Sequence, residues 1–261
     1  MTQLGEMVEV AAGVDPSWTC PFDHSPRTHN EKNVLPPPST KNNASTLSDS
    51  LDAESKGVAN ITIRFNYQRK RYTEDVQFTA HHIIPGNEAW PTSELNKWID
   101  HRKSEIVADI GYDVNAAYNG VDLPGHTAAS GWSDPGFQTR YAFGAIVADK
   151  KKRQFHDRHA AYSDFVVKVL DKIATKLEMH PSPGCGKKHC GGSKAKPYDP
   201  PYSLLARLMD VALRLERKVT GDSRKWKEPV FTSRFALMFK NRGLSQDQAR
   251  KQLETDQFIY P

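Results

Sequence analysis

The sequence lacks several features that would assign it to a class at once. It has no run of about 18 apolar residues, which a membrane-spanning helix needs, and it has only three cysteines in 261 residues. A small, odd number of cysteines argues against a disulfide framework and favours reduced thiols or metal ligation. There is no Gly-x-Ser-x-Gly elbow and no His-Glu-x-x-His pair, so neither serine-hydrolase nor zincin chemistry is indicated.

The first residues lack the marks of a secretory signal. Residues 1–14 have no basic start and no apolar core, and they carry Glu6 and Glu9. We therefore expect a protein that is cytoplasmic in the producing cell, or that leaves this cell by a route that needs no signal peptide.

Composition and charge are compatible with an anionic partner. The 17 prolines and 16 glycines, with a mean hydropathy of -0.66, predict a globular core with additional polar loops. The net charge is +5, which weakly favours a nucleic acid as partner. Basic residues form two runs, each of which a solvated face explains equally well: Arg64, Arg69, Lys70 and Arg71, then Lys150, Lys151, Lys152 and Arg153.

Apolar and polar residues alternate in two places, after an N-terminal stretch without such a pattern. Residues 1–57 contain the proline-rich piece Leu35–Pro38 and then a polar tract, so we expect an extended arm and linker. The alternation in residues 61–66 and again in 76–81 predicts two strands. The charged segment Gln68–Asp75 would connect them, giving a hairpin that ends at two histidines.

Helical spacing of apolar residues predicts three helices. They are expected at residues 91–111, at 155–177 with the stripe that includes His159 and Tyr162, and at 205–219 with Met209 facing inward. His101 falls outside the apolar stripe of its helix, so we expect it at the surface. Residues 125–136, with His126, are expected to form a loop, and the type of the apolar segment 229–240 is ambiguous.

Three short motifs carry the chemical information. His81 and His82 end a predicted strand, where successive side chains point to opposite faces, so one ring can bind a metal while the other takes a proton from water. The second motif is Asn119-Gly120-Val121-Asp122-Leu123-Pro124, whose turn residues place Asn119 in an ordered loop. The third runs from His156 through His159 to Tyr162.

Together these motifs resemble the AHH branch of the HNH, or ββα-metal, nucleases, which are related to endonuclease VII. The resemblance covers residues 58–180 and implies an α+β fold, with a ββα-metal core and extra helices. Outside the core we expect the arm at residues 1–57 and, at residues 181–261, a cysteine-containing knuckle followed by a helical extension.

The resemblance also implies the roles of individual residues. His82 would be the general base, and Asn119 would brace its loop and orient its ring. His81, His156 and His159 would hold one divalent ion, Mg, Mn, Ni or Zn. The order of roles within His81-His82 rests on the resemblance alone, and His156 has a phosphate contact as its alternative, because the histidine spacing is one longer in some relatives.

Other residues have weaker signals. Arg158 and Arg140 are candidate phosphate clamps, because a guanidinium grips two phosphate oxygens at once, although both are equally explained as surface arginines. Taken alone, His159 fits a hydrogen-bonded core histidine better than a metal ligand. It is the order and separation of all three motifs together that favour the nuclease.

A second metal site is also a hypothesis. Cysteine and histidine ligands typical of a structural zinc site occur near both ends of the chain; unligated thiols are the alternative. The residues are Cys20, Cys185 and Cys190, with His189 or His24 as the fourth ligand.

The resemblance implies an antibacterial toxin that cleaves DNA in the cytoplasm of a target cell. Domains of this kind are effectors of polymorphic toxins and of type VI secretion, so a cognate immunity protein and a secretion-apparatus or chaperone partner are expected. The alternatives are an RNase toxin on the same fold and a zinc-stabilised, non-catalytic nucleic-acid-binding or adaptor module. The last would show salt-sensitive binding without turnover.

Overall fold

The computed structural model describes residues 39–103, 106, 109–125, 132–179 and 203–255. The chain divides into two compact units, each made from three separate segments. The first unit comprises residues 1–43, 84–119 and 163–213, and the second comprises residues 44–83, 120–162 and 214–261.

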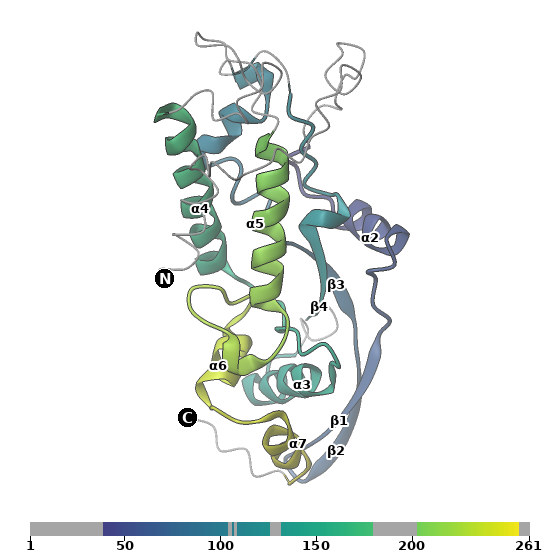
Figure 1. Cartoon of the computed structure of the whole chain (residues 1–261). Helices are drawn as coiled ribbons and strands as arrows, with labels where there is room; N and C mark the ends of the chain where they lie inside the picture. Colours follow the sequence, from purple (N-terminus) through teal and green to yellow (C-terminus); the bar gives the residue numbers. More distant parts are fainter. Residues whose placement is uncertain (1–38, 104–105, 107–108, 126–131, 180–202, 256–261) are drawn as a thin grey trace. The chain divides into compact units, whose positions relative to one another are not determined.

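The described residues form two sheets, both two-stranded and both in the second unit (Figure 1). Strand β1 (Ile61–Tyr67) pairs antiparallel with β2 (Lys70–Val76), so that Ile61 lies opposite Val76. Strand β3 (Phe78–His82) pairs antiparallel with β4 (Gly120–Pro124), which sets His81 opposite Val121 and His82 opposite Gly120.

The strands predicted from alternation are present, but the predicted pairing between them is wrong. The charged segment is strand β2, and it pairs with β1 across a turn of two residues, Gln68 and Arg69. Both have positive φ, 48° and 65°, as in the tight turns that match the twist of a hairpin. Strand β3 is therefore left to pair with β4.

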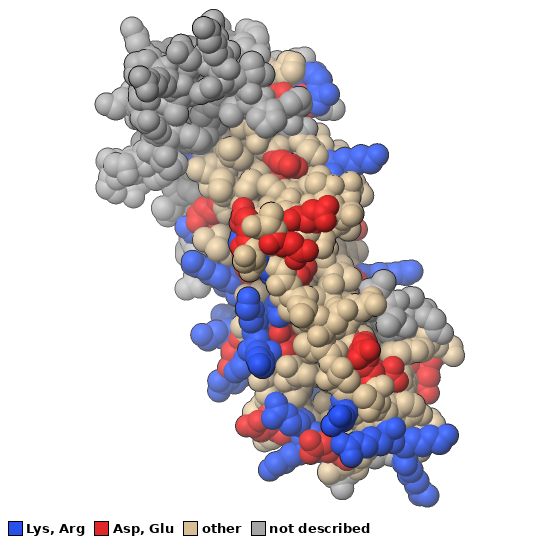
Figure 2. Space-filling view, turned by 90° about the vertical axis from the view of Figure 1, so that its right-hand side faces the viewer, with Lys and Arg blue, Asp and Glu red and all other residues tan. Residues whose placement is uncertain are grey.

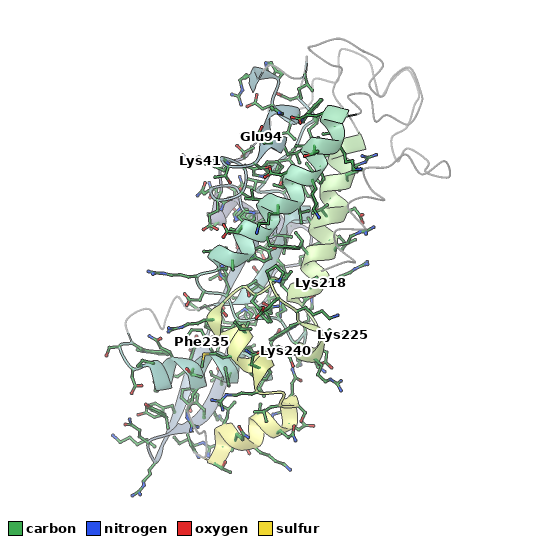
Figure 3. All side chains as sticks on the ribbon, turned by 90° about the vertical axis from the view of Figure 1, so that its left-hand side faces the viewer. Lys41, Glu94, Lys218, Lys225, Phe235 and Lys240 are labelled. Atoms are coloured by element: carbon green, nitrogen blue, oxygen red, sulfur yellow. The ribbon has the colours of Figure 1, made fainter. Side chains whose placement is uncertain are left out.

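Two helices pack on β1 and a third packs on one of them, and together they form the core of the second unit. They are α3 (Pro135–Ala148), α6 (Arg234–Asn241) and α7 (Gln246–Thr255). Ile63 and Phe65 of β1 are buried in the same cluster as Phe143 of α3 and Phe235 of α6, which Figure 3 labels.

Helix α3 lies in a region where the sequence predicted no helix. Asp134 caps it, its carboxylate accepting from the backbone N–H groups of Gly136 and Phe137, and Pro135 occupies its first turn. Every residue from Thr139 to Val147 is buried. A helix buried on all sides has no polar stripe, so its sequence lacks the amphipathic signal.

Part of the predicted linker is also helical. Helix α2 (Ala44–Ala53) buries two leucines four residues apart, Leu47 and Leu51, and packs on β3 and β4. A Cβ on Gly120 would lie 2.6 Å from Leu47 Cδ1, so the glycine of the second motif permits this close approach. Two apolar residues in ten were too weak a pattern to predict the helix.

In the first unit, the helix expected at residues 91–111 is replaced by the short 3-10 helices η1 (Glu94–Trp98) and η2 (His101–Lys103). The Asp100 carboxylate accepts hydrogen bonds from the backbone and side chain of Arg102. Such local side-chain bonds compete with a continuous helix. As predicted, His101 is exposed.

The two long helices are α4 (Ala160–Met179) and α5 (Ser203–Val219). The apolar stripe predicted for α4 is buried from Tyr162 to Leu177, but the helix begins at Ala160, later than expected. In α5, Met209 is 40% exposed, which corrects the prediction that it faces inward. The described residues also form the 3-10 helices η3 (Ala117–Asn119) and η4 (Ser223–Lys225).

Within the described residues, no helix is both long enough and apolar enough to span a membrane.

Candidate active site

Strand pairing places the first ligand candidate next to the third motif. Thr79 and His81 are two residues apart on β3 and share one face. At the end of β4, His156 forms a bridge with Gly125, and its backbone N–H donates to the Pro124 carbonyl at 2.8 Å. Thr79 Oγ1 lies 3.4 Å from His156 Nδ1, so the ring of His156 lies on the face that carries His81.

Three of the predicted site residues come together in the second unit. The ring centroid of His81 is 4.6 Å from that of His156 and 5.0 Å from that of His159, and the last two are 5.2 Å apart. One nitrogen atom from each ring lies within 4.8 Å of the others. Three nitrogen atoms this close together are candidates to share one ion, to which each would form a bond of about 2.0–2.1 Å.

The chemistry of the three rings fits a divalent ion. His81 is 3% exposed, and its buried Nε2 atom has no hydrogen-bond partner among the described residues. A buried lone pair without a partner is unfavourable unless something binds it. Burial, followed by the charges of His156, His159 and His82, holds the pKa of His81 well below its usual value. The ring is therefore neutral at pH 7, the state in which imidazole binds metals.

His156 and His159 are held by the chain before α4, which corrects the prediction that they occupy adjacent turns of a helix. The backbone N–H of Asp157 donates to the Thr232 carbonyl at 3.0 Å, and the His159 carbonyl accepts from the Tyr162 N–H at 2.9 Å. This segment is therefore tied to β4 on one side, through His156, and to the first turn of α4 on the other. Both rings are half-buried.

Tyr162 supports the cluster, a role that the sequence reasoning did not assign. Its hydroxyl donates to the Ile83 carbonyl at 2.6 Å, and its ring centroid lies 5.6 Å from those of both His81 and His159. Burial raises the pKa of Tyr162 far above its usual value, so it stays a donor. The signal was the tyrosine three residues after His159 in the third motif.

His82, the candidate base, is 7% exposed at the end of β3. Its charge is among the causes that lower the pKa of His81 and of His156, after burial and the other histidines. It therefore lies within electrostatic range of the cluster, on the strand position that faces away from His81.

In the first unit, Asn119 is fully buried and holds the loop after β3. Its Oδ1 atom accepts from the Ile84 N–H at 2.8 Å, and its Nδ2 atom donates to the carbonyls of Ile84 and Val114 at 3.1 and 2.8 Å. Both of its N–H groups are thus bonded to backbone. Asn119 fixes the chain two residues after His82, rather than donating to the ring of that histidine.

The two candidate phosphate clamps differ. Arg158 is exposed between the two histidines of the third motif. Arg140 is 1% exposed within α3 and donates to the Asn66 carbonyl at 2.6 Å, so the prediction that it grips a phosphate is wrong. Its aliphatic stem and planar head fill the core instead.

A solvated face was one of two equal explanations for the basic run that contains Arg153, but Arg153 is 4% exposed. Its guanidinium donates to both carboxylate oxygens of Asp149, at 2.9 and 2.6 Å, and to the Asp122 carbonyl at 3.2 Å. It also lies 4.6 Å from the ring centroid of Phe78. Arg153 therefore ties the segment before His156 to both β3 and β4.

Other candidate ligands contribute less. Asp100, His101 and Asp109 of the first unit also lie within metal-binding range of one another, but Asp100 is paired with Arg102 and His101 with Asp109. The proposed zinc ligands Cys20, Cys185, Cys190, His189 and His24 lie outside the described residues, as does His126.

Comparison with known families agrees with this geometry. Residues 63–181 match the model of AHH, a nuclease family of the HNH/ENDO VII superfamily with a conserved AHH motif. In this chain, Ala80-His81-His82 is that tripeptide. No curated protein and no solved structure matches the chain. The segment from residue 63 to residue 181 is therefore similar to the AHH family of nucleases.

Proposed function

We propose that this protein is a metal-dependent endonuclease that hydrolyses phosphodiester bonds in DNA. The observation that carries the proposal is the convergence of His81, His156 and His159, with the buried Nε2 atom of His81 left for a ligand. Three protein ligands are typical of catalytic metal sites, whereas structural zinc sites are usually closed by four. The geometry therefore favours catalysis over a purely structural role of the histidines.

His81, His156 and His159 would hold the ion. When bound, a divalent ion supplies positive charge that stabilises the phosphorane and the leaving oxygen. The protein's part is to orient the three imidazoles and to keep those of His81 and His156 neutral. Burial and the neighbouring histidines oppose protonation of His81 and His156, while Thr79 and Tyr162 restrict the rings they contact.

His82 is proposed as the general base that takes the proton of the attacking water. A neutral imidazole is suited to this near pH 7. Asn119 acts as a positioning residue, because its three bonds fix the chain that follows His82. Arg158 is exposed beside the metal ligands and is proposed to bind a phosphate oxygen of the substrate.

The distribution of charge supports a nucleic-acid substrate. The second unit, which contains the histidine cluster, has 22 lysines and arginines against 15 aspartates and glutamates, whereas the first has 14 against 16. The positive charge of the chain is therefore concentrated in the unit that would carry out the chemistry, where it attracts the phosphate backbone.

We propose further that the protein is an antibacterial toxin, delivered by a secretion route that needs no signal peptide and neutralised in its producer by an immunity protein. This rests on the resemblance of the three motifs to toxin nucleases. Expression in the bacterial cytoplasm tests it: wild type is expected to fragment the chromosome and stop growth, whereas His82→Ala is expected to do neither. Equal growth of the two strains would contradict the toxin proposal.

The activity itself is tested with supercoiled plasmid and structured RNA in the presence of Mg²⁺, Mn²⁺ or Ni²⁺. Wild type is expected to nick and linearise the plasmid, and His82→Ala to lose this activity by at least about a hundredfold, the usual lower range for a general base. His101→Ala is the matched control, since His101 is an exposed histidine in the other unit. If His82→Ala cuts as fast as His101→Ala, His82 is not the base; cleavage of RNA alone would replace DNA as the substrate.

A further inference from the structure

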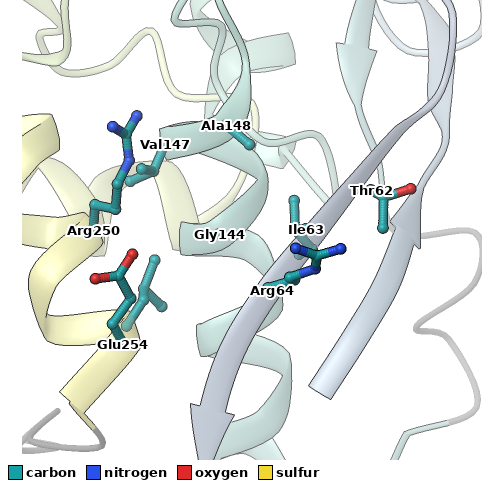
Figure 4. A pocket seen from close by; sticks show the side chains of 9 residues that line it. Thr62, Ile63, Arg64, Gly144, Val147, Ala148, Arg250 and Glu254 are labelled. Carbon is teal, nitrogen blue, oxygen red and sulfur yellow. The ribbon is translucent and has the colours of Figure 1, made fainter. Parts of the chain in front are cut away.

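A groove in the second unit lies where β1, α3 and α7 meet, and none of its lining residues belongs to the histidine cluster (Figure 4). Its volume is about 450 Å³, which is in the range of small-ligand sites. It is lined by Thr62, Ile63 and Arg64 of β1, by Gly144, Val147 and Ala148 of α3, and by Arg250, Leu253 and Glu254 of α7.

The floor of the groove is apolar and its rim is charged. Ile63, Val147 and Leu253 are buried. Gly144 is in contact with this floor, since a Cβ there would lie 3.0 Å from Ile63 Cδ1. Arg64, Arg250 and Glu254 are exposed. The combination suits a ligand with one flat or apolar part and one anionic part.

The two arginines at the rim differ from those that stabilise the fold. Arg102, Arg153 and Arg224 each form two or more short bonds to a nearby carboxylate. Arg64 has no ion pair among the described residues, and the ion pair of Arg250 with Asp247 is long, at 4.0 Å. Both guanidinium groups therefore have N–H donors available for an anion.

We propose that this groove binds a nucleic-acid strand outside the histidine cluster, with Arg64 and Arg250 at its rim each contacting a phosphate group. The proposal rests on the proposed nuclease function, and it adds a second contact that holds the substrate during cleavage. One guanidinium group can donate to two oxygens of a phosphate at once. The apolar floor offers a surface on which a sugar or a base can pack. Glu254 is the one lining carboxylate, and it opposes the anion.

The surroundings of the groove favour this ligand. The β1–β2 hairpin also exposes Arg69, Lys70 and Arg71. In Figure 2, lysine and arginine side chains, drawn in blue, gather at the lower end of the view, where Figure 1 places β1 and β2. A strand that lies in the groove would continue along a positively charged surface, which increases the attraction of its neighbouring phosphates.

The test compares two double variants that remove the same charge from the second unit. Arg64→Ala/Arg250→Ala removes the two lining arginines. Lys227→Ala/Lys251→Ala removes two exposed lysines of the same unit that neither line the groove nor belong to the β1–β2 hairpin. Binding of a labelled DNA oligonucleotide is measured by fluorescence anisotropy over a range of salt concentrations, with a chelator present to prevent cleavage.

The groove variant is expected to weaken binding about tenfold and to lower the slope of log K against log salt by about 2, one for each lost phosphate contact. The control is expected to weaken DNA binding by no more than about threefold, because its two charges act on the DNA only at a distance. Equal affinity and equal slope in the two double variants would overturn the proposal.

A single substitution of opposite sign sharpens the test. Glu254→Gln keeps the size of the side chain and removes the opposing charge, so it is expected to tighten DNA binding about threefold, the order of one partly screened charge. Unchanged or weaker binding would contradict a phosphate in the groove.

The outcome for the groove can be separated from that for the nuclease. If wild type binds DNA through the groove but does not cut it or RNA, the nuclease proposal fails and the groove stands. If wild type cuts DNA and the groove variant binds as well as its control, the groove proposal fails and the nuclease stands.

Discussion

Among single residues, the histidines of the cluster are buried by the fold even though removing each imidazole from water is unfavourable. Three imidazoles near one another cannot all be protonated, and burial adds to this penalty. The uncharged rings are therefore built into the fold, and their lone pairs are available to a cation. The cost of this arrangement is an acid-sensitive folded state.

The first prediction concerns that acid sensitivity. Burial, with the charge of His159 next, lowers the pKa of His156 to about 4, while an unfolded chain keeps about 6.5. Below pH 6.5 the unfolded state takes up a proton that the folded state refuses, so stability falls as the pH falls towards 4. Between pH 7.5 and pH 5, His156 alone is expected to lower the free energy of unfolding by about 2 kcal/mol.

Urea unfolding in the presence of a chelator measures this loss. His156→Asn removes the titrating group and is expected to reduce the difference between the two pH values by about 2 kcal/mol. An identical pH dependence in wild type and variant would show that His156 is not held neutral by the fold.

The second prediction concerns Asn119, whose side chain satisfies three buried backbone groups. Asn119→Ala leaves the N–H and carbonyl of Ile84 and the carbonyl of Val114 without this partner, so we expect a loss of about 3 kcal/mol in the free energy of unfolding. Asn241→Ala, at the exposed end of α6, is the control and is expected to change it by less than about 0.5 kcal/mol. A loss no larger than that of the control would remove Asn119 from its proposed bracing role.

At the scale of elements, the fold depends on short connections that are conformationally demanding. Gln68 and Arg69 both adopt positive φ in the turn between β1 and β2, a conformation that costs most side chains about 1–2 kcal/mol. The hairpin forms nevertheless, because β1 buries Ile63 and Phe65 in the core.

The third prediction follows from this turn. Gln68→Asn places a residue that tolerates the left-handed region at the first turn position, and we expect it to stabilise the protein by about 0.5 kcal/mol. Gln77→Asn, the same chemical change at an exposed position without positive φ, is expected to have no stabilising effect. Thermal unfolding of both variants decides the matter; a gain at Gln77, or a loss at Gln68, would contradict the strain assigned to the turn.

Helices and strands were predicted correctly where the pattern of apolar residues was regular, and were missed where it was weak. Strands β1 and β3 and the stripe of α4 were predicted correctly, because a single buried face produces a regular alternation of apolar residues. Helix α3 was missed because it is buried all round, and α2 because only Leu47 and Leu51 mark its buried side. The broken helix at residues 91–111 was missed because Asp100 bonds to its own neighbours.

At the scale of the whole molecule, the three motifs are far apart in sequence, and their convergence was predictable only through resemblance to a family. Spacing alone could not indicate that β3 pairs with β4, which is what brings His156 beside His81. The burial of Arg140 and Arg153 was equally inaccessible, since an arginine in the sequence is expected at the surface until its carboxylate or carbonyl partner is known.

The proposed chemistry depends on one divalent ion bound by His81, His156 and His159. Isothermal titration of the purified protein with Ni²⁺ or Zn²⁺ measures the number of ions bound per chain. We predict that the double variant His156→Ala/His159→Ala binds one ion fewer than wild type, while His101→Ala binds as many as wild type. If the double variant binds as many ions as wild type, with the same affinity, the three histidines do not form a metal site and the account is wrong.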